Sequence, residues 1–180
     1  MATIIVKPTD QSDPNYQSEL DTYNVQIEGI RTLASPDLAA KFTDSQLPES
    51  LIADDVYLAA KEREVLKDTG INAADVASQT AEVYRRLVYM TQLLVAIELK
   101  QQLLRIIRQR VMSTDTQMQA IDLESHVARL QANYISELIV VNPTASGTSS
   151  IPVAGATTSS EEIDFDVPYY NRTELYGRTP

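Results

Sequence analysis

The sequence predicts an all-α fold: a helical bundle of about three main helices with one very long central helix, an extended N-terminal arm and a long extended C-terminal tail. No proline lies between Pro48 and Pro143, and Gly70 is the only glycine there, so this stretch holds a single helix breaker. Its apolar residues recur at helical spacing. Residues 142–160 are instead rich in Gly, Pro, Ser and Thr, a composition that builds no core.

Residues 1–42 are the predicted N-terminal arm. Residues 4–6 are apolar, and Tyr23, Val25 and Ile27 alternate with polar residues. Alternation with a period of two is typical of a half-buried strand, so we expect short strands in this arm. The rest of the chain offers these strands no obvious partner, and we expect them to pair with each other or with another subunit.

Residues 43–141 are the predicted helical domain. Its first helix follows Pro48 and ends near Asp68. One face of this segment is apolar, through Leu51, Ile52, Leu58, Ala59, Val65 and Leu66. Gly70 is the expected stop, because glycine readily takes the left-handed backbone conformation found at helix C-termini.

The second predicted helix is the longest. Asn72 is its expected N-cap, with Asp75 three residues later, and no breaker follows until about Met112. A helix of roughly 40 residues would be about 60 Å long. Its second half is apolar on more than one side, which predicts neighbours on two sides and favours oligomerisation. The residues expected to pack a ring of subunits are Leu93, Leu94, Ile97, Leu104 and Ile107.

The third predicted helix follows the polar turn at residues 113–116. It runs to about Val141, where Asn142 and Pro143 end it. His126 lies on this helix and is the only histidine of a chain that has no cysteine, so we interpret it as a surface or interface side chain. A zinc site would need further His or Cys ligands, and no metal site is expected.

No group of residues in the sequence predicts catalysis or a bound cofactor. Glu62 and Glu64 could be taken for a pair of acid–base carboxylates, but basic residues surround them along the first helix. We therefore interpret this stretch as a solvated charged face. We expect no enzyme activity, no cofactor and no metal.

The net charge limits the classes of partner. The chain has 15 Lys and Arg against 25 Asp and Glu, a formal charge of −10. This acidity argues against a general nucleic-acid binder and against an anionic membrane surface as partner. No apolar run approaches the roughly 18–20 residues of a membrane span, and the N-terminus does not resemble a signal peptide.

The only basic cluster consists of Lys100, Arg105, Arg108 and Arg110. Two interpretations of it stay open. The side chains could contact DNA phosphates in a channel, or they could form salt bridges with acidic groups of a neighbouring subunit, which the surplus of acid favours.

Residues 142–180 are the predicted tail, a flexible linker followed by an aromatic-rich segment. Tyrosine and arginine are preferred anchors at protein interfaces, and a linker that ends in such residues is typical of a tethered docking peptide. The expected anchors are Phe165, Tyr169, Tyr170 and Tyr176, with Arg172 pairing an acidic group of the partner.

Residues 43–70 resemble the opening of the head–tail connector proteins of tailed bacteriophages, also called adaptor or head-completion proteins. The shared pattern is Leu47-Pro48, Leu51-Ile52, Tyr57-Leu58, Ala59-Ala60 with Glu62, and Thr69-Gly70. A long and a shorter helix follow, as in that family. The family often places a second glycine near the small pair, where this chain has two alanines.

The resemblance implies a structural virion protein assembled in the host cytoplasm. Such a protein is a subunit of a ring, expected to be a dodecamer, that lies in the neck between head and tail. The ring docks beneath the portal protein, contacts a tail or nozzle protein and prolongs the channel through which DNA passes as cargo. The C-terminal segment is then expected to dock on the portal or on another neighbour.

Two other function classes stay open. One is a DNA-packaging ring subunit like the small terminases, although the acidic N-terminal residues with their three prolines do not suggest a helix-turn-helix. The other is a non-viral helical scaffold protein. A hydrolase that uses Glu62 or His126 is the least favoured interpretation.

Overall fold

The computed structural model describes residues 3–35, 43–109 and 114–143. These ranges contain helices and turns and no strand, so the all-α prediction is confirmed for them. The elements in chain order are α1 (Tyr16–Ala34), α2 (Glu49–Ile52), a π-helical turn (Asp55–Ala59), α3 (Ala60–Thr69), a 3₁₀ helix (Ala73–Ser78), α4 (Ala81–Gln109) and α5 (Thr114–Val141).

Helix α1 corrects the prediction of strands in an extended N-terminal arm. Tyr23 and Ile27 were expected to alternate along a strand, but they lie four residues apart on the buried face of a 19-residue helix, and Ile30 continues that face. Val25, the middle residue of the alternation, is 71% exposed. A period of two over five residues cannot be distinguished from one helical turn, because i and i+4 share a face in both structures. The arm therefore contains a fourth main helix.

The first predicted helix is broken near its start. Helix α2 ends at Ile52, and the chain resumes through the π-helical turn into α3. The Asp54 carboxylate accepts a hydrogen bond from the Val56 N–H at 2.9 Å, which competes with the helical pattern. The predicted stop is confirmed: Gly70 has a φ of 72° and closes α3 in the left-handed conformation.

The predicted long helix starts later than expected. Asn72 precedes a 3₁₀ helix and makes no side-chain cap, and α4 begins only at Ala81. Local hydrogen bonds explain the interruption, because Ser78 Oγ donates to the Asp75 carbonyl at 2.8 Å and Thr80 Oγ1 accepts from the Val83 N–H at 3.3 Å. Helix α4 has 29 residues, and the expected end near residue 112 lies outside the described residues.

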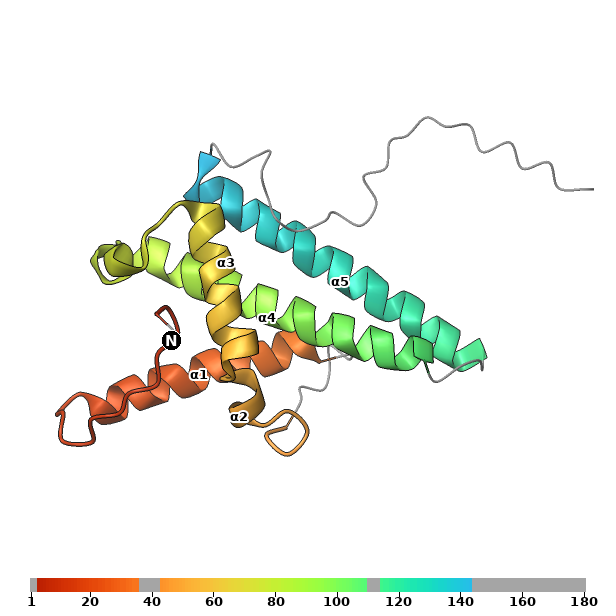
Figure 1. The fold of residues 1–180 in the computed structure, drawn as a ribbon, viewed down its shortest axis with the longest axis horizontal. Helices are drawn as coiled ribbons and strands as arrows, with labels where there is room; N and C mark the ends of the chain where they lie inside the picture. Colours follow the sequence, from red (N-terminus) through yellow and green to blue (C-terminus); the bar gives the residue numbers. More distant parts are fainter. Residues whose placement is uncertain (1–2, 36–42, 110–113, 144–180) are drawn as a thin grey trace, which may run out of the picture.

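Helix α4 is the centre of the bundle. It packs against α1 on one side and α5 on another, and α3 crosses it (Figure 1). Gly29 leaves room for the Gln92 side chain of α4, since a Cβ there would lie 2.4 Å from Nε2 of Gln92, which donates to the Gln26 carbonyl at 2.8 Å. The two apolar sides of α4 are thus covered within one chain. The predicted end of the last helix at Val141 is confirmed.

Candidate interaction site at the N-terminal segment

Residues 3–7, called here the anchor segment, are bound by the bundle through their backbone. The two carboxylate oxygens of Glu62 on α3 accept hydrogen bonds from the Ile5 N–H at 2.7 Å and from the Thr3 N–H. The Tyr84 hydroxyl on α4 donates to the Ile4 carbonyl at 2.8 Å. Three consecutive residues are therefore held by side chains that take the place of a neighbouring strand.

The apolar side chains of the anchor segment add a hydrophobic contact. Ile4 is 1% exposed and Ile5 is fully buried, and both belong to the main core. Burial of these two side chains favours docking of the segment, while the hydrogen bonds fix its register.

Glu62 is the residue that the sequence interpretation placed wrongly. It was expected on a solvated face, but it is 1% exposed. Burial raises the pKa of its carboxyl, and the backbone N–H donors of the anchor segment oppose that rise. The signal in the sequence was spacing: Glu62 precedes Val65 by three residues and Thr69 by seven, on the same buried face. Glu64, by contrast, forms a half-buried ion pair with Lys61 at 3.0 Å.

Lys7 ties the end of the anchor segment to two further helices. Its ammonium lies 2.7 Å from the Glu49 carboxylate on α2 and 5.8 Å from the centre of the Tyr23 ring on α1. The Tyr23 hydroxyl donates to the same carboxylate at 3.0 Å. The hydrogen bond from Lys7 holds the pKa of Glu49 below its ordinary value. The anchor segment thus touches α1, α2, α3 and α4.

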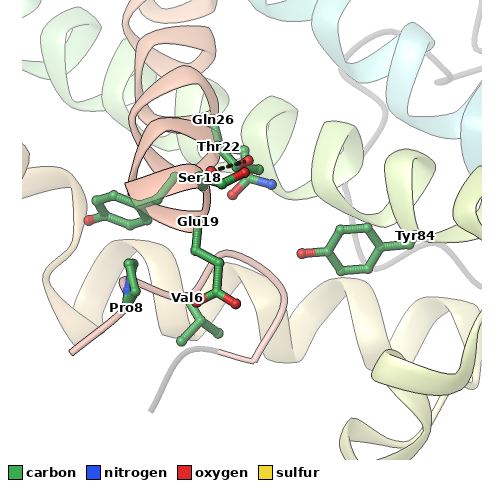
Figure 2. Close-up of a pocket in the computed structure, with 8 residues that line it drawn as sticks. Val6, Pro8, Ser18, Glu19, Thr22, Gln26 and Tyr84 are labelled. Atoms are coloured by element: carbon green, nitrogen blue, oxygen red, sulfur yellow. Dashed lines mark hydrogen bonds between the residues drawn. The ribbon is translucent and has the colours of Figure 1, made fainter. Parts of the chain in front are cut away.

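A cavity of about 360 Å³ lies beside the anchor segment, between it and helices α1 and α4. In Figure 2, Val6 and Pro8 line one side, Glu19 and Thr22 of α1 line another, and Tyr84 faces them from α4. Val6 is 56% exposed. One side of the segment is therefore packed into the core and another borders open space.

A second cavity, of about 300 Å³, is lined by basic side chains. Lys100, His126 and Arg129 line it. Lys100 is 2% exposed and its ammonium donates to the Ser35 carbonyl at 2.5 Å. Burial, and then the nearby charge of Arg129, lower the pKa of Lys100 to about 8. Lys100 is thus not presented to a DNA phosphate.

Among the other members of the expected basic cluster, the structure describes the side chain of Arg105 alone. Arg105 is exposed on α4. Arg108 lies on α4, but its side chain is outside the described residues, and so is Arg110 as a whole. The histidine, which was expected at the surface or an interface, is half-buried at the edge of the cationic cavity.

Four of the five residues expected to pack a ring fill the core of the single chain. Leu93 is fully buried, and Leu94, Ile97 and Leu104 are at most 8% exposed. They lie against α1 and α5 of the same chain, which were not foreseen as a pair of neighbours. The side chain of Ile107 is outside the described residues. Leu93, Leu94, Ile97 and Leu104 are thus buried within one chain and present little surface to another copy.

Two exposed apolar patches come from elements near the two ends of α3. Helix α2 and the π-helical turn precede its start, and the end of α5 lies beside its end (Figure 1). The first, called the α2 patch, consists of Leu51 and Val56, which are 40% and 70% exposed. The second, called the α5 patch, consists of Ile139 and Val140, which are 44% and 55% exposed. Hydrogen bonds of 3.3–3.4 Å from the Asn142 amide to the carbonyls of Asp68 and Thr69 hold the end of α5 against the end of α3.

The expected docking tail lies outside the described residues. The proposed anchors Phe165, Tyr169, Tyr170, Arg172 and Tyr176 are outside the described residues. Within residues 3–35, 43–109 and 114–143, no group of three His, Asp or Glu could hold a metal ion. No helix in those ranges is long and apolar enough to cross a membrane.

Comparisons with known proteins found no relative of this chain. No protein family matches it, no curated protein matches it, and no solved structure matches it. The resemblance to head–tail connectors stays a prediction from residues 43–70.

Proposed function

We propose that the chain is a structural subunit of a homo-oligomeric ring, and that the ring is the head–tail connector of a tailed bacteriophage. The observation that supports this most is the pair of apolar patches from elements near the two ends of α3. A ring needs a heterologous interface, in which one surface of a subunit contacts a different surface of the next. The α2 patch and the α5 patch are two such surfaces.

The core of the chain supports assembly from folded subunits. Apolar residues of all five α-helices and the anchor segment form one buried cluster, so the monomer does not depend on a partner for its core. In the proposal, copies fold first and then associate through the exposed patches. The portal acts as the template, and twelve copies are the expected number.

The net charge supports a conduit function in preference to a DNA-binding one. A channel that passes DNA should repel it, and the formal charge of −10 suits this task. In the proposal, DNA is only cargo, residues 142–180 dock on the portal or a tail protein, and the ring catalyses no reaction. A tethered tail adds affinity because, once the body is bound, the tail is at high effective concentration.

Complementary variants test the head-to-tail interface. Val56→Asp removes the α2 patch and Val140→Asp removes the α5 patch, while each chain keeps the other patch. Each variant alone should fail to form rings on the portal, and a mixture of both should stop at a heterodimer, because only one interface per pair remains. Native mass spectrometry reads these masses directly.

Val25→Asp is the matched control, because Val25 is 71% exposed on α1 and belongs to neither patch. This variant should assemble as the wild type does. Rings formed by either patch variant would refute the proposed interface. A salt-dependent gel shift with a specific DNA complex would favour the DNA-packaging alternative, whereas the connector proposal expects none.

A further inference from the structure

We propose that the groove occupied by the anchor segment is a peptide-docking site, and that its second ligand is the anchor segment of another copy of the chain. Neighbouring copies would then exchange their N-terminal segments. This inference deepens the proposed ring, since a ring holds a neighbour close, but the exchange itself can be tested on the chain alone.

The contacts separate cleanly into a ligand and a receptor. The ligand groups are the backbone of residues 3–5, two isoleucine side chains and the Lys7 ammonium. The receptor groups are Glu62, Tyr84 and Glu49, which come from α3, α4 and α2. Because each contact joins one set to the other, a segment from a second copy can make the same contacts.

The connection between ligand and receptor is a solvent-exposed loop. Residues 9–15 are all exposed. The hydrogen bonds shown for this loop are local turns, such as Ser12 N–H to the Asp10 carboxylate at 3.0 Å and Asn15 N–H to the Asp13 carboxylate at 2.7 Å. The carbonyls of Asp13 and Asn15 accept N–H groups of the first turn of α1 at 3.0 Å, so the residues that can reopen without disturbing α1 are Pro8 to Ser12. These five residues span roughly 17–18 Å when extended toward a neighbour.

The cavity beside the segment also favours exchange. Val6 and Pro8 border the 360 Å³ cavity (Figure 2), so the segment is not enclosed on that side. Exchange leaves every receptor group satisfied, because the incoming segment replaces identical atoms. The effective concentration of the neighbour's anchor segment then decides whether a groove holds the segment of its own chain or that of the neighbour.

Cysteine cross-linking on the full chain tests the exchange. The chain has no cysteine, so two single variants, Lys7→Cys and Glu49→Cys, each carry one reactive thiol at a contact that joins segment and receptor. The two are mixed in denaturant, refolded together at high concentration and treated with a short bismaleimide. Because the two chains refold together, a slow exchange of anchor segments between folded chains does not lower the yield of the cross-link.

The expected product is a covalent heterodimer linked between positions 7 and 49, identified by peptide mass spectrometry. Adding Ile5→Ser to the Lys7→Cys chain should reduce its yield at least tenfold. Lys67→Cys mixed with Glu49→Cys is the control, since Lys67 is an exposed lysine outside the anchor segment. A link that forms only in a chain carrying both Lys7→Cys and Glu49→Cys would overturn the proposal.

A labelled peptide of residues 2–9 gives an independent measurement. A full-length chain with Ile4→Ser and Ile5→Ser keeps the receptor but weakens its own segment, so it should bind the peptide at least tenfold more tightly than the wild type. Glu62→Ala added to that chain should abolish binding, and Glu64→Ala should not. Peptide binding that is indifferent to Glu62 would also overturn the proposal. Exchange without rings on a portal would refute the connector function alone.

Discussion

Substitution of Glu62 by alanine is the most informative single change in this protein. Glu62 is 1% exposed and accepts two backbone N–H groups from residues 57 and 59 positions earlier in the chain. Removing the carboxylate therefore disconnects the anchor segment from α3. Alanine keeps the helix, so the effect reports the contact and not helix propensity.

The magnitude follows from which groups lose a partner. Ile5 is fully buried, and leaving its N–H without an acceptor costs about 1–3 kcal/mol. The exposed Thr3 N–H can turn to water, so its lost bond contributes less. Alanine also removes the cost of burying the Glu62 carboxylate, whose pKa is raised by desolvation, and this gain offsets part of the loss. We expect Glu62→Ala to lower the free energy of unfolding by about 2–3 kcal/mol.

Glu64→Ala is the matched control on the same helix. Its half-buried ion pair with Lys61 should contribute below about 1 kcal/mol. The difference of about 2 kcal/mol corresponds to roughly 4–8 °C in Tm for a chain of this size. Urea unfolding followed by circular dichroism measures both variants. Equal destabilisation by Glu62→Ala and Glu64→Ala would refute the assignment of Glu62 as the residue that holds the anchor segment.

Three further predictions use the same unfolding assay. Leu93→Ala should cost about 2–5 kcal/mol at every protein concentration, because Leu93 packs the core of one chain. A loss that shrinks on dilution would instead place Leu93 at a subunit interface, since an interface contributes less as the assembly dissociates. Tyr134→Phe should lower the free energy of unfolding by about 1–2 kcal/mol, because the buried hydroxyl donates to Asp68 at 2.9 Å. Tyr57→Phe, which removes the half-exposed hydrogen bond to Gln102, should cost less. The reverse order would contradict the argument from burial. The pKa of Lys100 is about 8 in the folded chain and 10.5 in the unfolded chain. Between pH 8 and pH 10.5 the unfolded state therefore binds more protons, and the contribution of Lys100 to stability rises with pH. Lys100→Met should lower that slope relative to the wild type, and an unchanged slope would show that Lys100 does not titrate in this way.

The sequence predicted those elements whose signals are local. Gly70 ended a helix as expected, because its left-handed φ is a property of one residue. Asn142 and Pro143 ended the last helix for a similarly local reason. Helix α1 was missed because Tyr23 and Ile27, four residues apart, fit both the alternation of a strand and the spacing of a helix. Only the continuation of the apolar face to Ile30 distinguishes the helix from the strand.

The site depended on contacts between distant residues, which sequence patterns do not record. Glu62 lies next to basic residues in the chain, but what buries it is a segment 57 residues earlier. The sequence placed Lys100 in a basic cluster, but its ammonium donates to the Ser35 carbonyl, 65 residues earlier in the chain. The apolar second side of α4 suggested another subunit, because α1 had not been recognised as the helix that covers it.

The mass of the assembly formed with a portal tests the central claim most directly. The full-length chain is mixed with its candidate portal protein, and native mass spectrometry records the complexes. The account predicts a complex of one portal ring with about twelve copies of the chain, a complex that Val56→Asp prevents and Val25→Asp does not. A portal ring that binds no copies of the wild-type chain would contradict the connector function.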